Sequence, residues 1–338
     1  MRHPRHIAFL GTASAAALLL TSCGNGGGEG DDSDAFEGTL DLSLALGEGS
    51  HHHAGAEAFG DKLEELTEGR IQVQYHYDNA LGGEREVVEG MSINSIDMGI
   101  ASTGPIGGFV SDFFLFDMPY LFENHDHAHA VLDGEIGDEL ADLLKDDSNV
   151  QILGWMENGF RHQTNSVRPI NEPEDLRGID HRTQESEVQI DTWNALGANA
   201  TPMAWPEVYT ALQQGVMDSQ ENPLPTIVDV NFFEVQDYLA LTQHTYSPAP
   251  MMISGQLWDS LSEEDQGHFQ EAADHAVPIQ REASQEQEEE AIETLESEGM
   301  ETTEPDLEPF IEAVEPVYDK WAPELGEDRI ETARNFDY

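Results

Sequence analysis

Cations are scarce in this chain. It has 14 lysines and arginines against 68 aspartates and glutamates, which gives a formal net charge of −54. Nucleic acid and anionic membrane surfaces are therefore disfavoured as partners, because this surface would repel both. Such a charge excess is also typical of disordered chains. Apolar residues nevertheless recur at regular spacing through the main body, which argues against disorder there.

Cysteine and long apolar runs are scarce as well. Cys23 is the single cysteine, so no disulfide can form within the chain. The apolar run 7–20 follows the basic residues Arg2 and Arg5 and is too short for a comfortable membrane span, as is typical of a signal peptide. We expect a signal peptide over 1–22 and a flexible acidic tether over 23–37.

The end of that run resembles a bacterial lipobox. Its sequence is LTSC over 20–23, and in a lipobox the cysteine becomes the lipidated first residue of the mature protein. The resemblance implies a lipid anchor on Cys23 at the outer face of the cell membrane. The alternative is an ordinary signal peptide followed by an incidental cysteine.

Strand and helix patterns alternate along the remaining chain of about 315 residues, which is long enough for two domains. Period-two alternation predicts strands, and helical spacing of apolar residues predicts helices. The predicted strands are 39–44, 71–75, 96–101, 150–155 and 217–221, and the predicted helices are 52–66, 84–91, 186–196, 206–214 and 262–298. This order indicates an α/β fold with a largely parallel sheet.

Four motifs carry a resemblance to a known family. They are LGGERE at 81–86, NGFRHQTN at 158–165, PMAWPEVYTALQ at 202–213 and QENPL at 220–224. In this order and spacing they resemble the substrate-binding proteins of tripartite ATP-independent periplasmic (TRAP) transporters, of the dicarboxylate-binding type. Weaker similarity covers residues 38 to about 320.

The resemblance implies an α/β fold of the periplasmic-binding-protein type. Two lobes enclose a ligand cleft, and a long helix crosses both. We expect a first lobe over 38–158 with a return segment at about 248–287, and a second lobe over 159–247 with a C-terminal segment at about 288–338. The implied function is capture of a small organic acid and its delivery to the membrane subunits of a transporter, by a monomer that needs no cofactor.

Arginines are the natural partners of such an acid, because the guanidinium fork matches a carboxylate bidentately. Arg161 and Arg182 follow apolar runs that are typical of strands. The resemblance implies that Arg182 grips the ligand carboxylate, that Arg161 and Asn165 support or contact it, that Asn222 donates an amide N–H, and that Trp205 packs on the ligand body. The sequence departs from the family pattern before Arg182, where Asp180-His181 stands, and after Trp205, where Pro206 stands.

Three further residues are candidates from their position alone. Arg85 opens a helix near the loops of the first lobe, and Glu48 and Ser102 follow strands. The structural alternatives remain open: surface ion pairs for the arginines, core packing for Trp205, and a turn at Asn222 before proline.

Two histidine clusters raise the question of a metal. Three consecutive histidines at 51–53 cannot all point at one ion from regular structure, and His125, His127 and His129 fall where a helix begins. A metal site would also need cysteine or carboxylate ligands in suitable positions. We therefore expect no metal site.

The sequence leaves two alternative functions. A receptor for a zwitterionic compatible solute would use Trp205 as a platform for a cation. A secreted lipoprotein enzyme would need a catalytic motif, and the sequence has no nucleophile elbow, zinc-protease motif or phosphate-binding glycine loop. We expect a receptor rather than an enzyme.

The acid excess generates a prediction about salt. At about 1 M salt the Debye length falls to roughly 3 Å, so the repulsion among surface carboxylates is screened. We expect the melting temperature to rise between dilute buffer and molar sodium chloride, as in a protein from a saline habitat. Calorimetric melts across that range check this, and a melting temperature that stays flat or falls would contradict it.

Overall fold

The structure, a computed structural model, describes residues 35–338, which form one compact unit. The predicted signal peptide, the lipobox with Cys23, and nearly all of the tether lie outside the described residues. Within the described part no helix is long and apolar enough to cross a membrane. The division into two lobes at the stated boundaries stays a prediction.

The first part of the chain alternates strands and helices as predicted. Its elements are β1 (Gly38–Leu44), α1 (His51–Leu66), β2 (Ile71–His76), α2 (Glu84–Ser92) and β3 (Met98–Ile100). Ser50 begins α1 as its N-cap, since its hydroxyl accepts a hydrogen bond from the His53 N–H. Strand β1 pairs in parallel with both β2 and β3.

Short helices separate this part from the centre of the sheet. They are α3 (Thr103–Ile106), η1 (Ser111–Leu115), α4 (His125–Leu132) and α5 (Glu135–Ser148). The helix expected to begin at residue 125 is confirmed, with Asn124 as its N-cap.

A second series of elements builds the other half of the sheet. It comprises η2 (Pro173–Leu176), β5 (Asp180–Thr183), α6 (Glu187–Ala195), β6 (Asn199–Pro202), η3 (Trp205–Glu207), α7 (Val208–Gln213), β7 (Ser219–Pro223), α8 (Leu224–Asp229) and η4 (Phe232–Glu234). Strand β5 pairs in parallel with β6 and β7. The predicted helix over 206–214 is therefore a 3₁₀ turn followed by a short α-helix.

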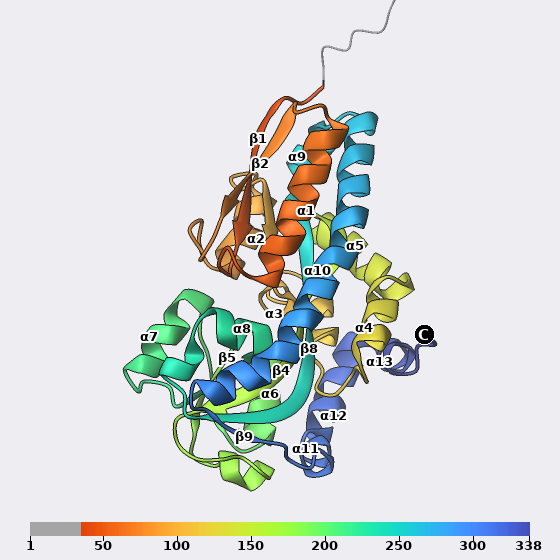
Figure 1. Cartoon of the computed structure of the whole chain (residues 1–338). Coiled ribbons are helices and arrows are strands. Elements are labelled where there is room, and N and C mark those ends of the chain that lie inside the picture. The colour runs from red at the N-terminus through yellow and green to blue at the C-terminus, as the bar shows by residue number, and fades with distance from the viewer. Residues whose placement is uncertain (1–34) are drawn as a thin grey trace, which may run out of the picture. The chain divides into compact units, whose positions relative to one another are not determined.

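Two long strands join the halves into one sheet (Figure 1). They are β4 (Val150–Asn165) and β8 (Tyr238–Ser254), which pair with each other antiparallel. The strand order of the whole sheet is β2-β1-β3-β8-β4-β7-β5-β6, and β9 (Glu301–Thr303) pairs with β8 beside this path. The prediction of a strand over 150–155 found only the first third of β4. Nearly every later residue of β4 is buried, and a strand covered on both faces shows no alternation in its sequence.

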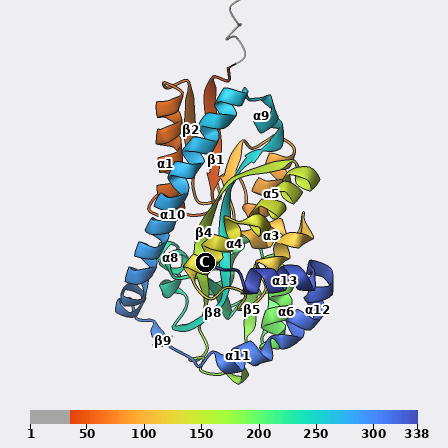
Figure 2. The same cartoon turned by 90° about the vertical axis from the view of Figure 1, so that its right-hand side faces the viewer.

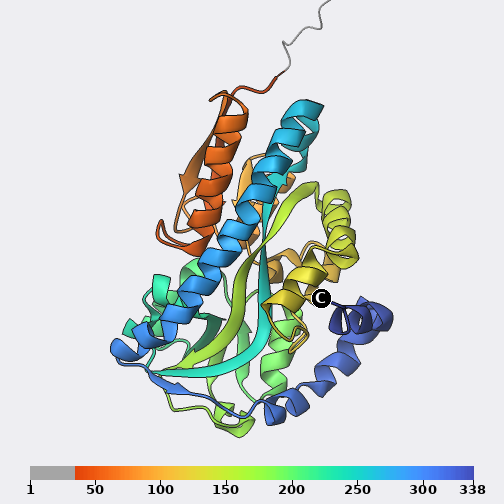
Figure 3. The ribbon, with the colours of Figure 1, turned by 45° about the vertical axis from the view of Figure 1, so that its right-hand side comes forward.

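The long helix α10 (Glu263–Ser297) spans the sheet from one half to the other, as predicted. Its first turns pack against α1 and its last against α8, and it leads into β9 (Glu301–Thr303) beside β8. Figure 3 shows it running diagonally across the two long strands. Gly55 permits the approach to α1, because a Cβ there would lie 2.6 Å from the Cβ of Gln280.

The remaining helices complete the chain. They are α9 (Gly255–Ser260), α11 (Glu308–Ala313), α12 (Glu315–Leu325) and α13 (Glu327–Arg334). Helix α12 packs against α6 (Figure 2). At this contact the Trp321 indole N–H donates a hydrogen bond to Asp191 at 2.7 Å.

The contact at Gly55 generates a prediction. We expect Gly55→Ala to lower the free energy of unfolding by about 1–3 kcal/mol, because the new methyl group forces α1 and α10 apart. Gly267→Ala is the matched control: it also lies in a helix, its Cβ would meet nothing within 4 Å, and the better helix propensity should stabilise by about 0.5–1 kcal/mol. Urea melts check both, and equal effects of the two substitutions would contradict the account.

Candidate ligand-binding site

A polar cavity lies where the two halves of the sheet meet. It is enclosed by residues that follow β1, β3 and β5, by the middle of β4, and by the elements around β7. The lining residues are Ala45, Leu46, His52, Glu84, Ser102, Asn158, Gln184, Trp205, Asn222 and Thr226. Crevices at the carboxyl ends of parallel strands are the usual ligand sites of open α/β sheets. Its volume is about 20 Å³, which is room for about one water molecule.

One wall of the cavity is a hydrogen-bonded group around a buried carboxylate. Glu84, in the first turn of α2, accepts from the backbone N–H of Ser102 at 2.6 Å and from its hydroxyl at 2.7 Å. The Asn158 side-chain amide donates to the same hydroxyl at 2.8 Å. One oxygen of Glu84 is thereby held in place, and the Ser102 hydroxyl connects Asn158 on β4 to Glu84 in the first half of the sheet.

Behind the opposite wall lies a fully buried ion pair. Arg161 donates through Nε and Nη2 to the carboxylate of Glu221, and Nη2 also meets the Glu221 carbonyl oxygen at 2.8 Å. Burial alone would raise the pKa of Glu221, but Arg161 and His244 hold it well below its ordinary range. Arg161 also donates to the Asn222 side-chain oxygen at 3.1 Å. That bond orients the amide nitrogen of Asn222, which donates to Gln220 at 2.6 Å.

Arg182 is the second buried guanidinium. Its Nε and Nη2 donate to the carbonyl oxygen of Met203 at 3.0 and 2.8 Å. Its Nη1 has no hydrogen-bond partner among residues 35–338, and burial lowers the pKa of Arg182 to about 10. The guanidinium carbon lies 5.7 Å from the ring centre of Trp205, which lines the cavity. A buried donor without an acceptor is costly, so this Nη1 is suited to an anionic ligand.

The residue before Arg182 points away from the cavity. His181 stacks on Trp193 with ring centres 3.8 Å apart and places Nδ1 2.7 Å from the Ser219 hydroxyl. Successive strand residues face opposite sides of a sheet, which accounts for this. Burial lowers the pKa of His181 to about 3, so the ring is neutral beside Arg182.

The structure brings together five of the eight predicted ligand-binding residues. Ser102, Trp205 and Asn222 line the cavity, and Arg161 and Arg182 contact these lining residues from behind.

The other three lie elsewhere in the described part of the chain. Asn165 ends β4, and its side-chain oxygen accepts from the backbone N–H groups of Val167 and Arg168. Arg85 is exposed, with its guanidinium 5.2 Å from the ring of Phe109, and Glu48 is exposed in the loop after β1. None of these three lines the cavity.

Sequence reasoning missed five polar residues of the cavity wall. They are His52, Glu84, Asn158, Gln184 and Thr226. Glu84 and Asn158 stand inside two of the recognised motifs, so motif membership was the available signal. His52, Gln184 and Thr226 carry no such mark, because only the fold brings their short segments together.

Comparison with known proteins identifies the family. The family model for bacterial extracellular solute-binding protein, family 7, matches residues 42–324. The 2,3-diketo-L-gulonate-binding periplasmic protein YiaO of Escherichia coli is 35% identical over 78% of this chain and 80% of its own.

Solved structures agree in fold. A TRAP periplasmic solute-binding protein from Polaromonas, bound to D-erythronate, has a TM-score of 0.87 and 40% identity over 89% of this chain and 100% of its own. One from Sulfurospirillum deleyianum, with bound succinate, has a TM-score of 0.84 and 27% identity over 88% of this chain and 99% of its own. These proteins are transport receptors, not enzymes. The chain belongs to the family 7 extracellular solute-binding proteins and is a periplasmic-type receptor of a TRAP transporter.

Proposed function

We propose that this receptor binds a hydroxylated monocarboxylate, such as a short sugar acid, and delivers it to the membrane subunits of its transporter. The observation that carries the proposal is the presence of two buried groups at and next to one cavity. Glu84 lines the cavity with its carboxylate, and Arg182, in contact with the lining residue Trp205, has an unpartnered guanidinium nitrogen.

Arg182 is the group suited to the ligand carboxylate. Arg161 is already saturated by Glu221, whereas Arg182 meets only a neutral carbonyl oxygen. A charged donor gains most from an ionised acceptor. We therefore assign the carboxylate to Arg182, and to Arg161 the task of holding Asn222 in place.

Glu84 discriminates among acids. One of its oxygens is occupied by Ser102, which leaves the second to accept from a ligand hydroxyl. A second carboxylate of a dicarboxylate would stand close to this buried negative charge and be repelled. Hydroxyl groups are favoured at that end of the ligand, and a second carboxylate is not.

Two relatives fit this assignment. The Polaromonas protein binds D-erythronate and the Escherichia coli protein binds 2,3-diketo-L-gulonate, and both acids carry one carboxylate and several oxygens. The relative with bound succinate, at 27% identity, differs in binding a dicarboxylate.

Ligand uptake requires the halves to separate. A four-carbon acid is much larger than one water molecule, and Arg182 contacts the lining residue Trp205 without lining the cavity itself. The Trp205 indole N–H reaches the Ala45 carbonyl oxygen at 3.4 Å and so links the two sides. Opening would break this weak hydrogen bond and expose the guanidinium of Arg182 to the ligand. Closure around the acid would then give the occupied receptor a shape that the transporter recognises.

A zwitterionic compatible solute is the second candidate. Its ammonium group would suit Glu84, which is the observation in its favour. The Trp205 platform is less available than the sequence implied, because Arg182 lies over one face of the ring and repels another cation there.

The anchor and the habitat rest on sequence alone. We propose that Cys23 carries the lipid that holds the receptor at the outer face of the membrane, that the receptor acts as a monomer, and that its acid excess adapts it to salt. The LTSC sequence at 20–23 supports the lipid anchor, and the net charge of −54 supports the adaptation to salt.

Arg182 provides the first test of the site. We expect Arg182→Ala to weaken binding of D-erythronate, or of whichever sugar acid binds tightest, because it removes the buried partner of the carboxylate. Truncating one partner of such a pair costs about 2–5 kcal/mol, which is about 30- to 4,000-fold in Kd. Titration calorimetry in molar salt measures the Kd of each variant. Arg177→Ala is the matched control, since Arg177 is exposed and its one ion-pair partner among residues 35–338 is Glu174. Equal Kd values for Arg182→Ala and the wild type would contradict the assignment.

Glu84 tests the selectivity. We expect Glu84→Gln to weaken sugar-acid binding by about 10- to 100-fold, because it removes the charge from one partner of a hydrogen bond. The same substitution should improve succinate binding relative to sugar-acid binding. Glu89→Gln, on the exposed face of the same helix, should change neither. The ratio of the two Kd values is the readout, and a ratio unchanged by Glu84→Gln would show that Glu84 does not select the ligand.

A further inference from the structure

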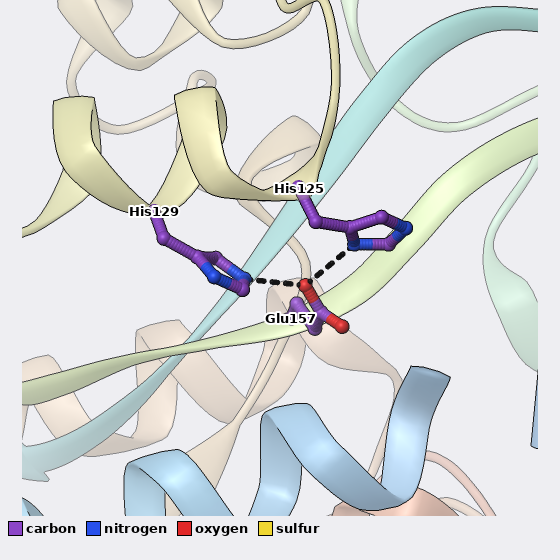
Figure 4. Close-up of side chains that lie close together, drawn as sticks. All are labelled: His125, His129 and Glu157. Atoms are coloured by element: carbon purple, nitrogen blue, oxygen red, sulfur yellow. Dashed lines mark hydrogen bonds and ion pairs between the residues drawn. The ribbon is translucent and has the colours of Figure 1, made fainter. Parts of the chain in front are cut away.

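A second cluster of chemically active side chains lies behind the ligand cavity, beneath α10. His125 and His129, one turn apart on α4, both point at Glu157 on β4 (Figure 4). One carboxylate oxygen, Oε2, lies 3.1 Å from His125 Nδ1 and 2.7 Å from His129 Nε2. One ligand atom from each of the three residues lies within 4.8 Å of the other two.

No arginine or lysine in the described part of the chain pairs with Glu157. Its side chain is fully buried, and among residues 35–338 the only ion-pair partners of Glu157 are these two histidines. The Tyr246 hydroxyl also donates to Oε2 at 2.6 Å. A buried carboxylate usually pairs with a cation or coordinates a metal, and imidazoles can serve either purpose.

The surroundings resemble the outer shell of a metal site. The second ring nitrogen of His125 lies 3.1 Å from Glu288 on α10. Histidine ligands of metals commonly give their other ring N–H to a carboxylate, which fixes the tautomer and ring orientation. Tyr246 holds the ligating oxygen of Glu157 in the same way.

Solvent reaches the cluster from two sides. His129 lines a surface hollow of about 1000 Å³ together with Asp133, and His125 lines another of about 590 Å³ together with Glu288. Acidic residues line each hollow: Asp138, Asp274, Glu282, Glu286 and Glu289 line the first, and Glu289 and Glu304 line the second. Clefts lined by negative charge concentrate cations.

We propose that His125, His129 and Glu157 form a binding site for a divalent transition-metal ion, with zinc the best match. Two imidazole nitrogens and one carboxylate oxygen form a ligand set that zinc accepts, with a water molecule at the fourth position. Ligands about 2.0–2.2 Å from a tetrahedral zinc ion stand roughly 3.3–3.6 Å apart. To accept the ion, the distance of 3.1 Å between His125 Nδ1 and Glu157 Oε2 would have to widen by roughly 0.2–0.5 Å, and the distance of 2.7 Å between His129 Nε2 and the same oxygen by roughly 0.6–0.9 Å.

From the sequence alone no metal site is expected at these histidines, because no carboxylate ligand in a suitable position can be identified. The structure supplies one in Glu157, which lies 28 residues beyond His129. His127, the third histidine of the run, points elsewhere and contacts the carbonyl oxygen of Ala333 at 2.8 Å.

The site would stabilise the centre of the fold. Gln280 of α10 bonds both the N–H and the carbonyl oxygen of Glu157, at 2.9 and 2.6 Å. Asn158, the next residue, lines the ligand cavity. A bound ion would therefore join α4 and β4 next to the ligand site and under the long helix.

The test is zinc binding to the purified protein, measured by equilibrium dialysis with metal analysis, and cobalt binding, followed by its visible absorption. We expect one equivalent of zinc and the intense absorption of four-coordinate cobalt. His129→Gln should weaken zinc binding at least 100-fold, and Glu288→Gln about 10- to 100-fold as an outer-shell change. His275→Gln, an exposed histidine on α10, is the control and should change nothing.

The outcomes are distinguishable. Circular dichroism and sugar-acid binding of each variant show whether it folds, and the cobalt spectrum of the wild type needs no variant at all. The proposal is overturned if the wild type binds no zinc above the buffer blank, which would leave an ion-paired network. Equal binding by the wild type and a folded His129→Gln variant would also overturn it, since the ion would then sit elsewhere, for example at the histidines of 51–53.

Discussion

The site depends on two buried guanidinium groups with only one carboxylate directly bonded to them. Arg161 and Glu221 neutralise each other through a bidentate ion pair in the middle of the sheet. Arg182 lies nearby with a carbonyl oxygen as its only hydrogen-bond acceptor in the described chain. Removing water from an ion is expensive unless a partner compensates it. The fold therefore holds Arg182 in a state that an anionic ligand would stabilise.

The neighbouring buried histidines are neutral, so they add no positive charge to that of Arg161 and Arg182. Burial lowers the pKa of His162 and His181 to about 3, and it also lowers that of His244 despite the contact with Glu221. His51 and His52, next to the cavity, are neutral for the same reason. A region with five buried histidines thus adds no positive charge at neutral pH, and the guanidinium of Arg182 dominates the field that a ligand carboxylate meets. The chain's net charge of −54 acts at its surface, where salt screens it.

The long strands explain how the site is positioned. Strand β4 carries Glu157, Asn158 and Arg161 within five residues, and it passes from the rear cluster to the cavity wall and then to the ion pair. The left-handed backbone of Gly159, with φ of +104°, coincides with a register shift against β8. This irregularity separates the part of β4 that serves the first half of the sheet from the part that serves the second.

Much of this could be predicted from the sequence. Helical and alternating patterns located α1, α2, α6 and α10, because each has one apolar face. The full lengths of β4 and β8 could not be predicted in this way, since strands buried on both faces show no period. Arg161, Trp205 and Asn222 were proposed from the motifs and Arg182 from the family resemblance, whereas Gln184 and Thr226 reach the cavity only through the fold.

The carboxylate of Glu157 was missed as a partner of His125 and His129 for a related reason. Contacts across 28 and 32 residues leave no trace in local spacing.

The most direct test of the account is a crystal structure of the receptor with the sugar acid that raises its melting temperature most. The account predicts the ligand carboxylate within hydrogen-bonding distance of Arg182 Nη1 and a ligand hydroxyl on Glu84. A carboxylate held by other residues, with Arg182 still bonded only to Met203, would contradict it.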